Sequence, residues 1–210
     1  MIALDEDMVG SDPSIVIALG LKVCLGLFAQ TNGMMLIGAH FTPSTTRGNM
    51  DLIMNLIANR GGSFKWMAMV SKFACWTGAD SGLNTPTKLA QYFRETCGYR
   101  GSVLSMDLTA APASYDVECS NGFVPSLGWR TTPDPLASTP ANNANVFALK
   151  RTIDRAQALL GIRVAITSLV PCDGSDTKVV HRLPDNVVGF TPIPSTSLRP
   201  EGIVMGVGRR

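Results

Sequence analysis

The chain alternates apolar segments with short runs of Gly, Pro, Ser, Thr and Asn. Residues 14–19 are rich in β-branched side chains and predict a strand, and residues 24–40 predict a β-hairpin. The apolar segment 64–76 predicts a further buried strand, and residues 102–108 predict another. Early strands, central helices and late strands together are typical of a layered α/β or α+β sandwich. We expect a mixed, mostly antiparallel sheet.

Helical spacing of apolar residues predicts about three helices. Residues 47–60 have one apolar face and follow several hydroxyl residues that can cap a helix. A second helix begins at Thr85-Pro86 and stops at Gly98. The third has its apolar stripe between residues 146 and 160. The last strands are predicted at 163–170, 178–183, 187–190 and 203–207.

Length and composition indicate a single domain over residues 1–210, because 45% of the residues are hydrophobic and can form a sizeable core. Residues 109–143 are rich in Pro, Ser, Thr, Asn and Gly and show little periodicity, so we expect an irregular insertion over the surface. The apolar segment 15–28 follows acidic residues and contains Lys22, which favours buried strands over a signal peptide or a membrane span.

Charge and cysteine usage exclude several classes of function. The net charge is only +2, and the one basic run is the terminal Arg209-Arg210, so no nucleic-acid partner is expected. Two histidines cannot form a His-rich metal site, and we expect no metal and no cofactor. Five cysteines without a C-x-x-C spacing favour a reducing compartment, and we expect a cytoplasmic protein without membrane insertion.

The predicted hairpin brings two reactive residue types together. If residues 31–33 form a three-residue loop with Gly33 in the left-handed conformation, opposed residues have numbers that sum to 64. Cys24 then faces His40, with β-carbons about 5 Å apart. A thiol beside an imidazole is the minimal arrangement for a cysteine nucleophile.

The same register pairs Gly26 with Gly38, which would leave a bare slot for a substrate beside the thiol. A two-residue turn at Asn32-Gly33 is the alternative, with a sum of 65. It would place the thiol and the imidazole on opposite faces of the sheet.

The remaining cysteines and histidine are interpreted structurally. His181 alternates with apolar residues and is expected at a solvent-facing strand position. Four cysteines have no histidine nearby in the sequence and are expected to be structural thiols: Cys75, Cys97, Cys119 and Cys172.

Two segments carry a resemblance to a known family. Residues 18–24 (ALGLKVC) resemble the T-L-G-x-G-S-C segment of CheD-type chemoreceptor glutamine deamidases, and residues 37–43 (IGAHFTP) resemble that family's G-G-M-A-H-x-x-L-P segment. The resemblance covers roughly residues 13–75 and 142–190. Residues 77–141 would be an insertion that the family lacks.

The resemblance implies a CheD-like fold, with Cys24 as the nucleophile and His40 as the general acid/base. The family's catalytic threonine falls at Ala18, and Lys22-Val23 replace its Gly-Ser. Toxin deamidases of the cytotoxic-necrotizing-factor type share the Cys-His core and hold their histidine with other groups. Candidates for orienting the imidazole here are Ser14, Thr42, Thr45 or a main-chain carbonyl.

The implied activity is hydrolysis of a glutamine side chain in a partner protein, which releases ammonia. Backbone N–H groups in the turn before Cys24 are the expected oxyanion donors. Lys22, Val23, Gly26 and Gly38 are expected to line the site. Two alternatives are a catalytically silent protein-binding module on the same scaffold, and a toxin-like deamidase delivered into a host cytosol. The partner is then a bacterial chemoreceptor or a host protein.

Overall fold

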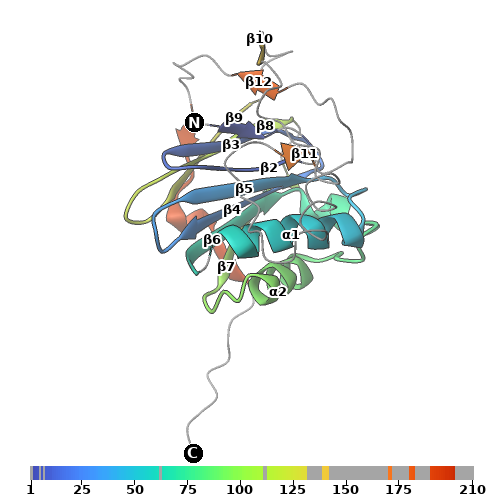
Figure 1. Ribbon diagram of the computed structural model, residues 1–210. Coiled ribbons are helices and arrows are strands. Elements are labelled where there is room, and N and C mark those ends of the chain that lie inside the picture. Colours follow the sequence, from blue (N-terminus) through green and yellow to red (C-terminus); the bar gives the residue numbers. More distant parts are fainter. Residues whose placement is uncertain are drawn as a thin grey trace, which may run out of the picture.

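The protein is built from three layers, two β-sheets and one layer of helices (Figure 1). The computed structural model describes residues 2–4, 6, 8–61, 63–110, 113–131, 139–141, 170–171, 180–182 and 190–201. Within these residues the fold is α+β, with two mostly antiparallel sheets and two α-helices, and it is not a barrel. The predicted layered sandwich is therefore confirmed at this level.

The central sheet lies between the other two layers, and its strand order is β11-β2-β5-β4-β6-β7-β14. Every neighbouring pair in it is antiparallel except β6 and β7, which are parallel. Its strands are β2 (Met8–Asp12), β4 (Leu25–Thr31), β5 (Leu36–Phe41), β6 (Phe64–Ser71), β7 (Val103–Asp107), β11 (Val170–Pro171) and β14 (Arg199–Glu201).

The second sheet has the order β1-β3-β8-β9-β13, and a separate pair joins β10 to β12. In the second sheet, the one parallel pair among the described strands is β1 with β3. The strands of the second sheet are β1 (Ile2–Leu4), β3 (Ile15–Leu21), β8 (Tyr115–Ser120), β9 (Ser126–Thr131) and β13 (Thr191–Pro192). The strands of the separate pair are β10 (Thr139–Ala141) and β12 (Val180–Arg182). Without the two-residue strands β11 and β13, the two sheets contain six and four strands.

Both described α-helices begin and end where the sequence predicts. The helix α1 (Arg47–Gly61) starts after Thr46, whose hydroxyl accepts a hydrogen bond from the backbone of Asn49 at 3.3 Å. The helix α2 (Pro86–Thr96) is capped by Thr85, and Gly98 follows it with φ = +60°. The predicted third helix, over residues 146–160, lies outside the described residues. No described helix is long and apolar enough to cross a membrane.

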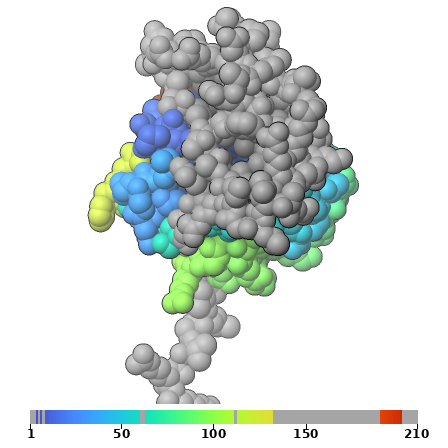
Figure 2. Space-filling model, viewed as in Figure 1, coloured from blue at the N-terminus to red at the C-terminus, as the bar shows by residue number. Residues whose placement is uncertain are grey.

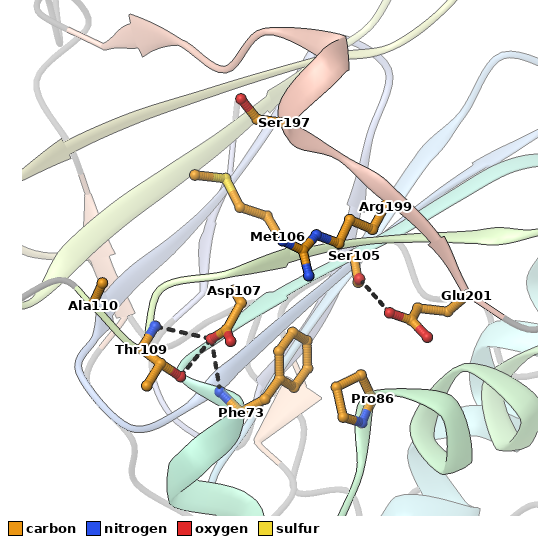
Figure 3. A pocket seen from close by; sticks show the side chains of 10 residues that line it. All are labelled: Phe73, Pro86, Ser105, Met106, Asp107, Thr109, Ala110, Ser197, Arg199 and Glu201. Atoms are coloured by element: carbon orange, nitrogen blue, oxygen red, sulfur yellow. Dashed lines mark hydrogen bonds between the residues drawn. The ribbon is translucent and has the colours of Figure 1, made fainter.

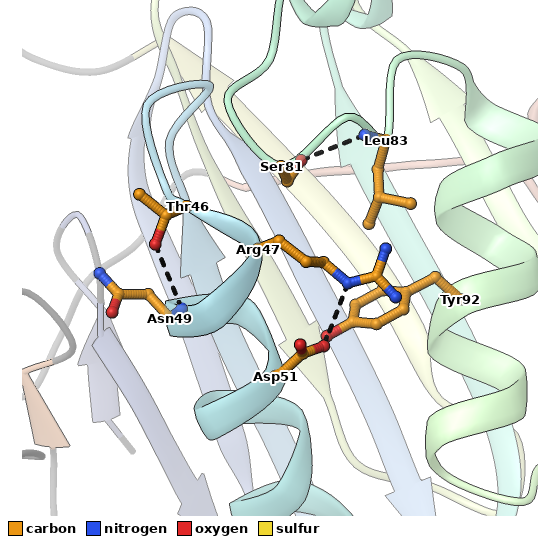
Figure 4. A network of polar contacts seen from close by, with 7 residues as sticks. All are labelled: Thr46, Arg47, Asn49, Asp51, Ser81, Leu83 and Tyr92. Carbon is orange, nitrogen blue, oxygen red and sulfur yellow. Dashed lines mark hydrogen bonds and ion pairs between the residues drawn. The ribbon is translucent and has the colours of Figure 1, made fainter.

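A polar contact joins the two helices (Figure 4). The hydroxyl of Tyr92 on α2 donates to Oδ1 of Asp51 on α1 at 2.7 Å. The guanidinium of Arg47 pairs with the same oxygen at 3.1 Å and lies 4.1 Å from the centre of the Tyr92 ring. Three side chains thus hold the first turns of α1 against α2.

Side chains alternate between two hydrophobic cores along the central sheet, as expected for strands buried on both faces. One core lies between this sheet and the helices and includes Leu25, Leu27, Ala29, Ile37, Ala39 and Phe41. The other lies between the two sheets and includes Leu4, Val16, Ala18, Cys24, Phe28 and Val117. The alternation decides which residues of the hairpin face the second sheet.

Two sequence predictions need correction in the middle of the chain. The apolar segment 64–76 is a strand only to Ser71, and residues Phe73–Trp76 form the short 3₁₀ helix η1. The segment 109–143, expected to be irregular, contains β8 and β9, which form an antiparallel hairpin against β3. The alternation of apolar and polar residues that indicates a strand is interrupted in β8, because Asp116 is polar but buried.

Residues 77–141 therefore contribute to the interior of the domain. They supply α2, β7, β8 and β9, with buried side chains such as Leu89, Phe93, Val103 and Val117. Whether the segment is an insertion relative to a family stays a prediction. The β8–β9 turn, which protrudes in yellow at the edge of Figure 2, carries Phe123, 90% exposed.

Candidate active site

The β4–β5 hairpin has a three-residue loop, but one residue later than the sequence predicts. The backbone N–H of Met34 donates to the carbonyl of Thr31 at 3.0 Å, and the N–H of Thr31 donates to the carbonyl of Met35 at 3.0 Å. Met34, rather than Gly33, has the left-handed conformation, with φ = +61°. Opposed residues therefore have numbers that sum to 66. The expected sums of 64 and 65 are both wrong.

Contacts from distant segments stabilise this loop. The side chain of Asn121, in the β8–β9 turn, donates to the carbonyl of Met34 at 2.6 Å, and the ammonium of Lys65 lies 3.0 Å from the Met34 sulfur. The backbone and side chain of Asn32 both donate to Ser63, at 3.0 and 2.7 Å. A non-glycine residue in the left-handed region costs about 1 kcal/mol or more, and these contacts offset that cost.

In the observed register His40 does not lie opposite Cys24, but both residues remain on the same face of the sheet. Gly26 lies opposite His40, and Gly38 lies opposite Phe28. Cys24 comes two positions before Gly26, so it occupies the diagonal position relative to His40 on the same face, where β-carbons are about 7–8 Å apart. Both side chains are buried on the side of the second sheet, at 1% and 0% exposure. The direct pairing of Cys24 with His40 is wrong, and their shared face remains.

A main-chain carbonyl orients His40. Its Nδ1 lies 3.2 Å from the carbonyl oxygen of Leu4, at the end of β1. A carbonyl oxygen can only accept, so Nδ1 carries the proton, and Nε2 is the basic nitrogen of the neutral ring. Leu4 is the neighbour of Ala18 in the β1–β3 ladder. Of the orienting groups left open by the sequence, the structure shows the carbonyl.

The turn that carries Cys24 is tied to the central sheet through its own carbonyl groups. The hydroxyl of Ser71, at the end of β6, donates to the carbonyl of Cys24 at 2.9 Å. The indole N–H of Trp76 donates to the carbonyl of Val23 at 3.1 Å. Trp76 is fully buried, so this contact holds the turn at a fixed place in the core.

An ion pair between the buried Asp116 and the partly buried Arg130 holds the start of the same turn. Oδ1 of Asp116 accepts from the backbone N–H of Gly20 at 3.0 Å, and Gly20 has φ = +64°. Oδ2 of Asp116 pairs with the guanidinium of Arg130 at 2.9 Å, and the guanidinium lies 4.8 Å from the ring of Phe190. The sequence analysis did not single out Asp116, because this residue lies in the segment expected to be irregular.

The thiol also contacts an acidic residue that sequence reasoning missed. Sγ of Cys24 lies 3.5 Å from Oε1 of Glu6, and Glu6 is exposed. The contact therefore joins the buried sulfur to an exposed carboxylate. The acidic run that contains Glu6 was visible in the sequence, but only as a feature unlike a signal peptide.

The glycine strip beside the thiol is packed rather than open. A β-carbon built on Gly38 would lie 2.4 Å from Cγ1 of Val16, and one built on Gly26 would lie 3.2 Å from the β-carbon of Ala18. The second sheet thus fills the expected substrate slot. The other two residues expected to line the site, Lys22 and Val23, are exposed at the turn.

The other described cysteines differ in how far they are buried. Cys75 is exposed, whereas Cys97 and Cys119 are buried. Burial raises the pKa of Cys97 to about 12, and burial with the nearby charge of Glu118 raises the pKa of Cys119 further. These two are unreactive near neutral pH, which agrees with a structural role.

Two further predictions fall largely outside the described part. Cys172 lies outside the described residues. The backbone of His181 is in β12, but the predicted direction of its side chain is not described.

Among the residues that the structure describes, no three His, Cys, Asp or Glu side chains come together as metal ligands. No family model, curated protein or solved structure matches the chain in the three comparisons.

Proposed function

We propose that Cys24 and His40 are the nucleophile and the general acid/base of a cysteine hydrolase that deamidates a glutamine side chain of a partner protein. The observation that carries this proposal is the fixed imidazole. Its Nδ1 is held by the Leu4 carbonyl, and it shares the buried face of the central sheet with the Cys24 turn. The resemblance of residues 18–24 and 37–43 to CheD-type deamidases gives the substrate class.

The reaction proceeds in two halves. Nε2 of His40 takes the proton from the Cys24 thiol, and the thiolate adds to the carboxamide carbon of the glutamine. His40 returns that proton to the leaving nitrogen, which departs as ammonia and leaves a thioester. Water, deprotonated by His40, then cleaves the thioester to a glutamate carboxylate and the free thiol. The N–H groups of Gly20 and Lys22 already donate to Asp116 and to the carbonyl of Gly20. The other backbone N–H groups of the turn before Cys24 are the donors for the oxyanion.

The carbonyl of Leu4 accounts for a departure from the family pattern. The family's catalytic threonine falls at Ala18, which has no hydrogen-bonding side chain. Leu4 lies next to Ala18 in the neighbouring strand, and its carbonyl supplies the contact to the imidazole. A main-chain acceptor of this kind keeps the same ring nitrogen protonated as a side-chain acceptor would.

Burial favours a second candidate, the catalytically silent binding module. Both reactive side chains are buried, and the glycine strip is filled by the second sheet. A macromolecular substrate reaches the sulfur only if side chains packed around it move, because Cys24 is buried. The two candidates therefore differ in whether the Cys24 thiol becomes accessible and reacts in the folded protein.

The decisive experiment measures ammonia release and a mass increase of about 1 Da per glutamine in candidate partners, first the cytoplasmic helices of a chemoreceptor. Cys24→Ser and His40→Asn are expected to abolish both signals. Cys75→Ser is the matched control, because it removes an exposed thiol and is expected to leave activity unchanged. Undiminished deamidation by Cys24→Ser would overturn the proposal. A host protein as the only substrate would favour the toxin-like alternative.

A measurement without a substrate separates the two candidates. In the Cys75→Ser protein at neutral pH, iodoacetamide is expected to alkylate Cys24 in the folded state if it is the nucleophile. Mass spectrometry of peptides locates the label. Absence of label on Cys24 until the protein is unfolded would favour the binding module.

A further inference from the structure

A cavity of about 490 Å³ lies at the carboxyl ends of β6 and β7. These strands form the parallel pair of the central sheet, and α2 is part of the connection between them. In such units, ligands characteristically bind at the carboxyl ends of the parallel strands. The volume is within the range of small-molecule sites. Position and size together indicate a binding pocket.

The charged side chains of this pocket are arranged around the cavity (Figure 3). Arg199 and Glu201 come from β14, and Asp107 comes from the end of β7. Figure 3 shows the guanidinium of Arg199 directed over the cavity, with Asp107 on one side and Glu201 on the other. Among the described residues, no ion pair joins Arg199 to either carboxylate. One cation and two anions therefore face the same space.

The two carboxylates are held in place by neighbouring groups. Oδ1 of Asp107 accepts from the backbone N–H of Phe73 at 3.3 Å and of Thr109 at 2.9 Å. Oε1 of Glu201 accepts from the hydroxyl of Ser105 at 2.9 Å, and its Oε2 accepts from the hydroxyl of Thr87 at 3.2 Å. These contacts use one oxygen of Asp107, and the other is open to a donor from a ligand.

We propose that this pocket binds an aliphatic α-amino acid. Its carboxylate pairs with Arg199, and its ammonium donates to Asp107 and Glu201. The apolar lining residues Phe73 and Pro86, which lie side by side in Figure 3, accept the aliphatic side chain. A ligand with both charges fits better than an anion alone, because the two protein carboxylates repel a second anion.

The pocket is close to the Cys24 turn but separate from it. Asp107 is paired with Ser71, and Ser71 with Leu25, so two strand spacings, about 10 Å, separate Asp107 from the residue after Cys24. Binding of the amino acid requires no thiol chemistry. It is therefore independent of the proposed deamidase function, and Cys24→Ser is expected to bind the ligand unchanged.

Isothermal titration calorimetry on the full chain tests the proposal with L-leucine and two derivatives. N-acetyl-L-leucine lacks the ammonium, and L-leucinamide lacks the carboxylate. L-leucine is expected to bind saturably, and each derivative about tenfold more weakly or less well still, because each loses a charge-assisted contact. Absence of saturable binding of L-leucine, or equal binding of all three compounds, would overturn the proposal.

A variant then assigns the carboxylate contact. Arg199→Gln is expected to weaken L-leucine about tenfold and to leave L-leucinamide unaffected. Arg100→Gln is the matched control, because it removes the same charge from an exposed position that does not line the cavity. Equal effects of Arg199→Gln on L-leucine and on L-leucinamide would contradict the assignment. The melting temperature of each variant is measured first, so that a loss of binding is not a loss of fold.

Discussion

The substitution Gly38→Ala tests whether the glycine strip beside Cys24 is packed or open. The new β-carbon would lie 2.4 Å from Cγ1 of Val16 and 2.8 Å from Cδ1 of Leu4. Carbon atoms without a bond between them are best placed about 3.5–4.0 Å apart. Val16 and Leu4 are fully buried between the two sheets, so neither can move into solvent. The added methyl group must separate the sheets locally.

The expected cost follows from two opposing effects. Overpacking a buried site costs about 1–3 kcal/mol. Replacing glycine also restricts the unfolded chain, which returns about 0.5 kcal/mol. We therefore expect Gly38→Ala to lower the free energy of unfolding by about 0.5–2.5 kcal/mol. Gly33→Ala is the control, because its β-carbon would have an ordinary contact of 3.7 Å at the exposed hairpin loop.

Urea unfolding followed by tryptophan fluorescence gives the free energies, with the midpoint and slope fitted for each variant. A double-mutant cycle with Val16→Ala adds a specific check. Removing Cγ1 of Val16 relieves the clash, so the two substitutions are expected to be coupled favourably by about 1 kcal/mol. If Gly38→Ala costs no more than Gly33→Ala and shows no coupling, the strip is open and the packing argument is wrong.

Three further predictions follow from single contacts. Burial and the hydrogen bond to the Asp51 carboxylate on α1 raise the pKa of Tyr92. The free energy of unfolding should therefore fall as the pH rises above about 10, where the phenol of the unfolded chain ionises. Tyr92→Phe should make this decline less steep, as measured by melting curves at several pH values. Iodoacetamide at about pH 8 should modify the exposed Cys75 and leave Cys97 unmodified, as peptide mass spectrometry will show, since burial raises the pKa of Cys97 to about 12. Arg130→Met removes the guanidinium that neutralises the buried Asp116 and should cost about 3–5 kcal/mol in urea unfolding; a cost below 1 kcal/mol would contradict a buried ion pair.

Local signals predicted the helices well. A helix end depends on hydrogen bonds within a few residues, so the hydroxyl of Thr85 and the left-handed Gly98 mark α2 without knowledge of the rest of the fold. The same holds for Thr46 at the start of α1. The β8–β9 hairpin was missed because burial of Asp116 depends on Arg130 of the neighbouring strand. A single-sequence pattern does not contain such a pairing.

The candidate site was predicted in part. The sequence pointed to Cys24 and His40 on one hairpin face, and the structure keeps both on that face. It placed the loop one residue too early, because glycine is the usual residue for a left-handed position. Met34 takes that position through contacts to Asn121 and Lys65, which are distant in the sequence. Register therefore depended on packing that the hairpin sequence does not encode.

By itself, the sequence determined the presence of the β4–β5 hairpin, the ends of the two described helices and the residue types that could form a thiol–imidazole pair. Only the tertiary structure decided the register, the closure of the glycine strip and the group that orients His40. The physical reason is that these depend on long-range contacts. The carbonyl of Leu4 is the clearest case: every residue has a carbonyl, so no side-chain pattern could reveal which one would meet the imidazole.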